Sequence, residues 1–100
     1  MRARFIGILL LLAGCASTPK PLLEYTLARS AIEAAQNVEA VRYAAAYWHQ
    51  AGEYYRAAEI QYRKQDYQKA KENFELARNF AEKSENLARL KKFKSGDFVP

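Results

Sequence analysis

The stretch from Leu22 to Phe93 contains no proline and a single glycine, Gly52. It is rich instead in alanine, glutamate, lysine, arginine and glutamine, which are among the best helix formers. Pro21 suits the first position of a helix, and Gly96 suits a left-handed cap after the last one. The sequence therefore predicts an all-α domain over residues 22–94, followed by an irregular tail over residues 95–100.

The polar residues 64–66 are the best internal break in this helical stretch. Asp66 is a favourable N-cap, so we expect one helix to end near Arg63 and another to run from Tyr67 to about Phe93. Both helices carry apolar residues at steps of three and four. The first stripe is Val41, Ala44, Trp48, Ala51, Tyr55, Ala58 and Tyr62. The second is Tyr67, Ala70, Phe74, Ala77, Ala81, Ser84 and Ala88, widened by Phe80, Leu87 and Leu90. Alternating aromatic and small residues predict an antiparallel helical hairpin in which rings pack beside alanines.

The segment before Val41 has two interpretations. The first stripe continues upstream through Leu23, Leu27, Ala31, Ala34 and Val38. This is compatible with one unbroken arm of roughly 60 Å, which would extend past the second helix and leave apolar surface uncovered. A break within residues 37–43 would instead let residues 22–36 fold back as a third helix. Periodicity alone fits both a long hairpin and a short three-helix bundle. We predict the short three-helix bundle, with breaks near residues 37–43 and 64–66.

Residues 1–14 have the pattern of a secretory signal. Arg2 and Arg4 form a positive n-region, and residues 5–12 form an apolar h-region. This apolar run is far too short to span a bilayer, which takes about 20 residues. We therefore predict cleavage between Gly14 and Cys15 rather than a transmembrane helix.

Cys15 is the only cysteine, and it ends the run Leu12-Ala13-Gly14-Cys15. This run resembles the lipobox of bacterial lipoproteins. The resemblance implies a diacylglyceryl thioether on Cys15 and an acyl chain on its new N-terminus; two chains already anchor a protein stably. Ala16, where an aspartate would favour inner-membrane retention, implies the outer membrane. We expect residues 15–21 to be the lipidated cysteine and its tether. The alternatives are a non-lipidated signal peptide with an accidental cysteine and a cytosolic chain with an apolar start.

Part of the chain resembles a tetratricopeptide repeat. Trp48-x-x-Ala51-Gly52-x-x-Tyr55 is similar to the first helix of that repeat, and the segment from Asp66 to Ala77 is similar to its second half. The spacing between the halves is too long, the closing proline is missing, and there is no second copy. We interpret the likeness as the same way of packing a helical hairpin, not as a true repeat.

The chain more closely resembles a domain-of-unknown-function family of small, alanine-rich bacterial lipoproteins. The matching stretches are residues 40–44 and 65–70, and the resemblance covers roughly residues 22–90. Relatives tend to have Gly, Pro and Gly where this chain has Glu39, Ala45 and Gln65. The missing Gly and Pro weaken the prediction of a sharp turn near residue 40. Relatives are often joined to a peptidoglycan-binding domain of the outer-membrane-protein-A type, and the family implies no chemistry.

No set of residues indicates catalysis. His49 is the only histidine, and without a second histidine or a further cysteine it cannot form a four-ligand zinc site. The acidic residues alternate with lysine and arginine around the helices, the serines lack a nucleophile setting, and there is no Gly-rich phosphate loop. We predict a non-enzyme with no metal, no small-molecule substrate and no cofactor beyond the covalent lipid on Cys15.

The aromatic residues offer a candidate partner surface at Tyr47, Trp48 and Tyr54. Trp48 also fits the core, whereas Tyr47 and Tyr54 lie beside the stripe and are expected to be exposed. Exposed tyrosine and tryptophan are enriched at interface anchors.

The formal net charge of the full chain is +5, and signal cleavage removes Arg2 and Arg4. A periplasmic lipoprotein does not meet nucleic acid. The available acidic surfaces are lipid headgroups, lipopolysaccharide and the cell-wall polymer, although a solvated helical surface also explains the charge. Lys91, Lys92 and Lys94 form a basic patch near the end of the last helix. The patch either complements the helix dipole or contacts such an acidic surface.

Two functions fit these features. The first is a non-enzymatic outer-membrane lipoprotein that presents a helical hairpin in the periplasm as a scaffold or adaptor of an envelope complex. The alternative is a structural lipoprotein that self-associates through its stripe, as the major enteric coiled-coil lipoprotein does. The terminus Phe98-Val99-Pro100 lacks the lysine of that protein's covalent wall tether, so any peptidoglycan contact would be non-covalent.

Overall fold

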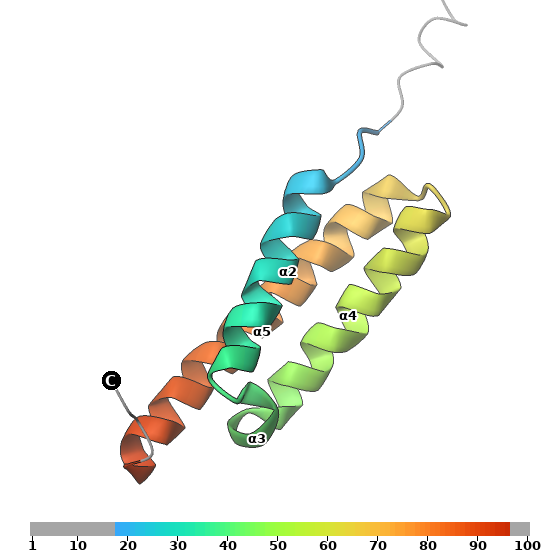
Figure 1. The fold of residues 1–100 in the computed structure, drawn as a ribbon. Coiled ribbons are helices and arrows are strands. Elements are labelled where there is room, and N and C mark those ends of the chain that lie inside the picture. Colours follow the sequence, from blue (N-terminus) through green and yellow to red (C-terminus); the bar gives the residue numbers. More distant parts are fainter. Residues whose placement is uncertain (1–17, 97–100) are drawn as a thin grey trace, which may run out of the picture.

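The computed structural model describes residues 18–96, and all elements in that range are helices. The predicted signal sequence, Cys15 and residues 97–100 lie outside the described residues. The helices are α2 (Leu22–Asn37), α3 (Ala40–Tyr43), α4 (Ala45–Arg63) and α5 (Tyr67–Ser95). In Figure 1, α2 and α4 both lie along α5, with α4 antiparallel to the other two. Over the described residues, the predictions of an all-α domain and of a three-helix arrangement are confirmed.

A tight turn separates α2 from α4, at the predicted break within residues 37–43. Glu39 adopts a left-handed backbone conformation with φ 59° and ψ 42°, and its N–H donates to the carbonyl of Gln36 at 3.0 Å. The Lys92 ammonium lies 3.1 Å from the Glu39 carboxylate and ties this turn to α5. The single unbroken arm is therefore excluded, and the turn forms with Glu39 and Ala45 at the positions where the family resemblance implies Gly and Pro.

The second turn, between α4 and α5, is a Schellman motif. The N–H of Asp66 donates to the Gln61 carbonyl at 2.9 Å, and the N–H of Gln65 donates to the Tyr62 carbonyl at 3.0 Å. Gln65 takes the left-handed conformation, with φ 62°. The predicted helix ends at Arg63 and Tyr67 are confirmed. Asp66 occupies the N-cap position, but its side chain makes no capping hydrogen bond and lies 4.0 Å from the Lys69 ammonium instead.

Replacing Gln65 by glycine is expected to stabilise the bundle by about 0.5–1 kcal/mol. A Cβ atom makes the left-handed conformation costly, and glycine removes that cost. Thermal denaturation measures the effect, with Gln65→Ala as the control that shortens the side chain and keeps Cβ. Equal melting temperatures for the two variants would contradict strain at Gln65.

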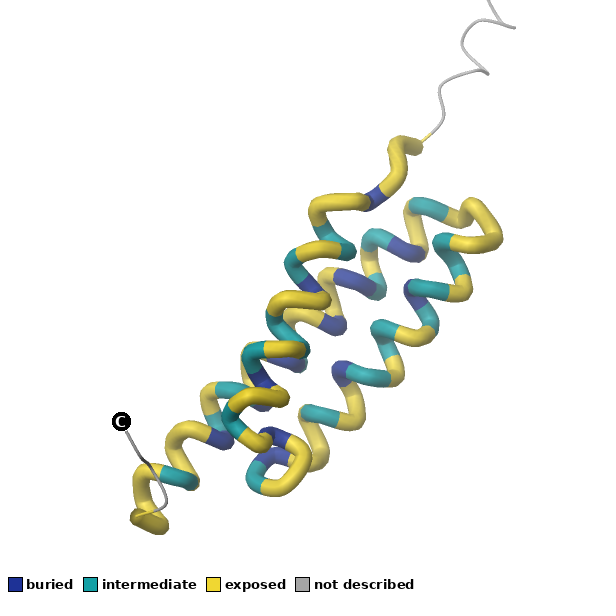
Figure 2. Tube along the Cα trace, in the orientation of Figure 1, coloured by how far each residue is buried: buried dark blue, intermediate teal, exposed yellow. Residues whose placement is uncertain are grey.

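The core is built almost entirely from alanine, which lets the three long helices approach closely. Figure 2 shows the buried positions as a stripe along the inner face of each helix. The buried apolar side chains are Ala28, Ala35, Ala40, Ala44, Ala51, Ala58, Ala70, Phe74, Ala77, Ala81 and Ala88. Ser84 is buried with them, and its hydroxyl donates to the Ala44 carbonyl at 3.3 Å. Phe74 is thus the one large side chain sealed inside the described bundle.

The predicted stripe is right for α5 up to Ala88 and wrong for α2. On α2 the buried residues are Ala28 and Ala35, while Leu23 is exposed. Val41 and Leu90 are also exposed rather than part of the stripe. The predicted α2 stripe assumes that this segment continues the helix of the first arm without a break. Instead, α2 folds back and packs mainly on α5 through its alanines. Beyond Ala88, α5 extends past α3 (Figure 1) and ends at Ser95, so Ser95 is helical and not the first residue of the predicted irregular tail. Gly96 follows as the predicted left-handed cap, with φ 76°.

Candidate functional site

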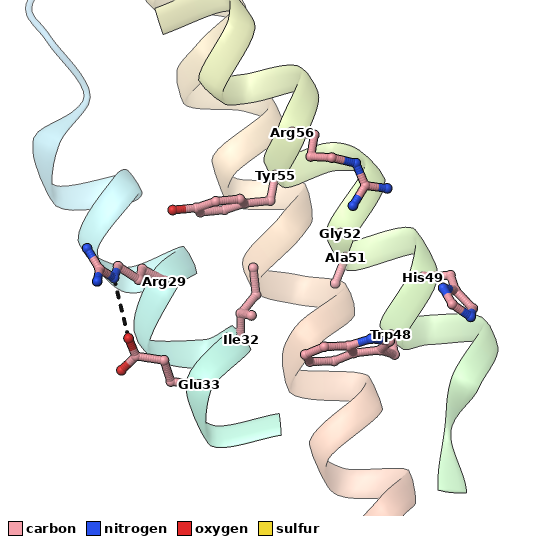
Figure 3. A pocket seen from close by; sticks show the side chains of 9 residues that line it. All are labelled: Arg29, Ile32, Glu33, Trp48, His49, Ala51, Gly52, Tyr55 and Arg56. Carbon is pink, nitrogen blue, oxygen red and sulfur yellow. Dashed lines mark hydrogen bonds and ion pairs between the residues drawn. The ribbon is translucent and has the colours of Figure 1, made fainter. Parts of the chain in front are cut away.

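A groove runs between α2 and α4, because both helices pack on α5 and touch each other only slightly. Its wider part has a volume of about 360 Å³. Ile32 points from α2 towards α4, and Trp48 and Tyr55 point from α4 towards α2 (Figure 3). Ala51 completes this apolar floor. The charged groups lie at the rims: Arg29 and Glu33 on α2, and His49 and Arg56 on α4, where both side chains point away from α2.

The groove continues towards the α4–α5 turn as a second hollow of about 270 Å³. Its lining includes Leu22 and Tyr25 from α2 and Glu59, Tyr62 and Arg63 from α4, with Phe74 of α5 beneath. We call the two hollows together the α2–α4 groove.

Three aromatic rings divide the groove and join its walls. The rings of Tyr25 and Tyr55 stack across it with centroids 6.3 Å apart. Both rings meet Phe74 edge-on, at 5.5 Å and 5.6 Å. Each long helix supplies one member of this trio, so it fixes the spacing of α2 and α4 on α5.

A polar ladder on α2 holds the rim beside these rings. Arg29 donates from Nη1 to the Tyr25 hydroxyl and from Nε to the Glu33 carboxylate, both at 3.3 Å. The hydrogen bond to Tyr25, and then that to Glu33, raises the pKa of Arg29. The guanidinium therefore stays charged at the edge of the apolar floor.

The environment of Tyr55 in the groove raises the pKa of its phenol. Its partial burial, together with its hydrogen bond to Tyr25 and the nearby Glu59 carboxylate, raises its pKa from 10.0 to about 12. Arg29 opposes this shift. The neutral phenol is thus the form that the folded groove favours.

The free energy of unfolding is expected to fall between pH 10 and about 12 through Tyr55. In that window the unfolded chain loses the Tyr55 proton while the folded chain retains it, so rising pH favours unfolding. Denaturant titrations of the wild type and of Tyr55→Phe measure the difference. The variant is expected to lose less stability across the window, and identical pH profiles would contradict the shift.

The structure separates the three aromatics of the predicted partner surface. Trp48 is half-buried and lines the α2–α4 groove. Tyr47 and Tyr54 lie on another side of α4, against Phe80 of α5, with centroid distances of 6.3 Å and 5.4 Å. Tyr54 is half-buried rather than exposed, because the Phe80 ring stacks against one face of its ring.

The structure also shows where His49 and the predicted basic patch lie on the bundle. His49 is exposed at the groove rim beside Trp48. Lys92 is mostly buried, ion-paired with Glu39 and placed 5.8 Å from the centre of the Tyr43 ring, so it is a structural contact. The basic patch near the chain end is therefore reduced to the exposed Lys91 and Lys94.

A family model described as a domain of unknown function, DUF4398, matches residues 23–95. The chain belongs to the DUF4398 family. The match spans both turns and nearly the whole α2–α4 groove, so the groove is part of the DUF4398 domain itself. No curated protein and no solved structure matches this chain.

Sequence reasoning missed Tyr25, Arg29 and Ile32 as groove residues. Their positions depend on the fold-back of α2, which periodicity left open. Within residues 18–96, no helix is long and apolar enough to cross a membrane.

Apolar rings between two helices, with charges at the rims, are typical of sites that accept the apolar face of another helix.

Proposed function

We propose that this protein is a non-enzymatic lipoprotein, anchored in the bacterial outer membrane through lipid on Cys15. Its DUF4398 bundle acts in the periplasm as an adaptor that holds an amphipathic helix of an envelope protein in the α2–α4 groove. The lipobox-like run at residues 12–15 supports the anchor. The groove is the observation that carries the adaptor role.

A helix is the occupant that the groove favours by shape. Two helices that lie side by side on a third leave a seat for a fourth, and a fourth helix there would complete a four-helix bundle. The floor of Ile32, Trp48 and Tyr55 offers rings and a branched chain to an apolar face. The rims carry both signs of charge, from Arg29, Glu33, Arg56, Glu59 and Arg63. A partner helix with mixed polar flanks matches this pattern.

Gly52 lines the α4 side of the groove. Glycine inside a helix is less stable than alanine by roughly 0.5–1 kcal/mol, so its presence calls for a local reason. A Cβ atom at residue 52 would lie 3.1 Å from Nη1 of Arg56, whose guanidinium folds back over this position. Gly52 thereby provides space for the Arg56 guanidinium at the rim, and a leucine at residue 52 would displace that guanidinium and add bulk at the edge of the groove.

Site-specific photocrosslinking in intact cells tests the adaptor role. A photoreactive residue in place of Ile32 is expected to give a discrete adduct with one envelope protein. The same residue in place of Asn86, which is exposed on α5, is the control and is expected to give none. Adding Gly52→Leu should remove the Ile32 adduct. Equal adducts from both sites, or an Ile32 adduct that survives Gly52→Leu, would contradict binding in the groove.

Self-association is the second candidate, and one observation favours it. Val41, Leu90 and Phe93 are exposed near the end of the bundle where α5 extends past α3. Exposed apolar groups of this kind mark contact surfaces when they lie together. Sedimentation of the chain from Ala16 to Pro100 distinguishes the candidates, because a stable trimer supports a structural lipoprotein and a monomer supports the adaptor.

A further inference from the structure

The end of the bundle where α2 begins also contains the α4–α5 turn (Figure 1). We call it the turn end and define it by Lys20, Leu22 and Leu23 together with residues 60–69. Leu22 lines one hollow together with Tyr62 and Arg63. Beside the turn end, the Lys71 ammonium of α5 lies 3.9 Å from the Glu24 carboxylate of α2.

Apolar side chains are exposed at the turn end. Leu22 is 58% exposed and Leu23 is 66% exposed, although they are the first two residues of α2. Ile60, one turn before the end of α4, is exposed as well. Covering such side chains is favourable by about 25 cal/mol for each Å² removed from water. Part of the turn end therefore suits an apolar or interfacial environment.

The same end carries an excess of positive charge. Lys20, Arg63, Lys64 and Lys69 are all exposed there. Asp66 is the acidic residue of the turn and lies beside Lys69, while Glu24 is paired with Lys71. Leucines surrounded by lysine and arginine are the composition that binds anionic bilayer surfaces.

The path of the chain places the predicted anchor at this end. Thr18 is the first described residue and precedes α2 directly, and Cys15 is three residues further upstream. One residue spans at most about 3.6 Å, so Cys15 lies within roughly 25 Å of Leu22 whatever path the tether takes. A lipid on Cys15 would hold the turn end, and not the opposite end, close to the bilayer.

From these three observations we propose that the turn end rests on the anionic bilayer surface. Leu22 and Leu23 enter the interface, and Lys20, Arg63, Lys64 and Lys69 lie over the headgroups. The second hollow of the α2–α4 groove then lies next to the membrane, and the larger hollow beside Ile32 and Trp48 lies further from it. This proposal rests on the lipid anchor of the proposed function, and it adds the face that the bundle turns towards the lipid.

A vesicle-binding experiment on residues 18–100 tests the proposal without the anchor. All four helices and every buried residue of the described bundle lie within residues 21–95, so this fragment retains the whole core. It contains no cysteine, so a single introduced thiol can carry an environment-sensitive fluorophore. The label replaces Leu23 at the turn end or, as the matched control, the exposed Leu90 near the opposite end.

With vesicles of phosphatidylethanolamine and phosphatidylglycerol, the Leu23→Cys label is expected to shift to the blue and the Leu90→Cys label to stay unchanged. Each basic residue near an anionic surface raises partitioning about fivefold, so Lys20→Gln with Lys64→Gln should lower it roughly 30-fold. Lys91→Gln with Lys94→Gln removes the same charge at the other end and should change it less than about twofold. The fragment should bind only weakly to vesicles of phosphatidylcholine, which carries no net charge.

Three results would overturn the proposal: no binding to the anionic vesicles, equal shifts of the two labels, or equal losses from the two lysine pairs. Palmitate labelling of the full chain reports the anchor separately. If the full chain carries no label but the fragment still binds vesicles, the lipid anchor is contradicted. If the full chain is labelled but the fragment does not bind, only the proposal of a membrane-facing turn end is contradicted.

Discussion

Replacing Phe74 by alanine is expected to lower the free energy of unfolding by about 3–5 kcal/mol. Phe74 is the largest fully buried side chain of the described bundle, and Tyr25 and Tyr55 pack edge-on against its ring. Its buried neighbours are alanines, which cannot reach into the space that the ring would leave. The free energy of unfolding of a domain of this size is roughly 5–15 kcal/mol. The loss is therefore a large fraction of its stability.

Urea denaturation of residues 18–100, followed by circular dichroism, measures this loss. Phe93→Ala is the matched control on the same helix, because Phe93 is 72% exposed. Its effect is expected to stay within about 0.5 kcal/mol, as for most exposed sites. Similar losses for the two variants would contradict the position of Phe74 as the shared centre of α2, α4 and α5.

Replacing Ala77 by leucine is expected to destabilise the bundle by about 1–3 kcal/mol. Ala77 is fully buried on α5, in one cluster with Ala28 of α2 and Ala58 of α4. A larger side chain would push both helices away from α5. Since α2 packs mainly on α5, it should open first, and amide hydrogen exchange in α2 should increase more than in α4.

Glu75→Leu adds a leucine to an exposed position of the same helix and serves as the control for Ala77→Leu. It is expected to change stability by no more than about 0.5 kcal/mol. A stabilised Ala77→Leu variant, or uniform exchange along α2 and α4, would contradict close packing of three helices around residue 77.

The α4–α5 hairpin could be predicted from the sequence because its apolar period and its polar break agree. The residues between Arg63 and Tyr67 interrupt both stripes, and the α5 stripe from Ala70 to Ala88 is buried as expected. Local signals sufficed for this part, since both helices use the same small-and-aromatic pattern against each other.

The place of α2 could not be predicted from periodicity, since its apolar residues also fit a continuous arm. The turn depends on Glu39, an ordinary residue in a conformation that usually favours glycine. Its ion pair with Lys92 comes from the distant end of α5, which no local pattern reveals. Residues 39 and 65, where the family resemblance implies glycine, are the two non-glycine positions with positive φ among the described residues.

The candidate site could be predicted only in part for the same reason. Trp48 was expected at a partner surface and lines the α2–α4 groove. The other wall comes from α2, so Tyr25 and Ile32 could not be assigned before α2 was placed. Tyr47 and Tyr54 lie on a different face of α4 from Trp48 and pack against Phe80 of α5. This contact depends on how α4 and α5 are aligned in the hairpin.

The most direct test of a lipid-anchored bundle is metabolic labelling of the full chain with palmitate, combined with membrane fractionation. The wild type is expected to carry the label and to fractionate with the outer membrane. Cys15→Ser should lose both, while its helical bundle, which lies wholly downstream, should remain folded. A wild-type chain without label would contradict lipidation of Cys15 and, with it, the membrane-anchored adaptor.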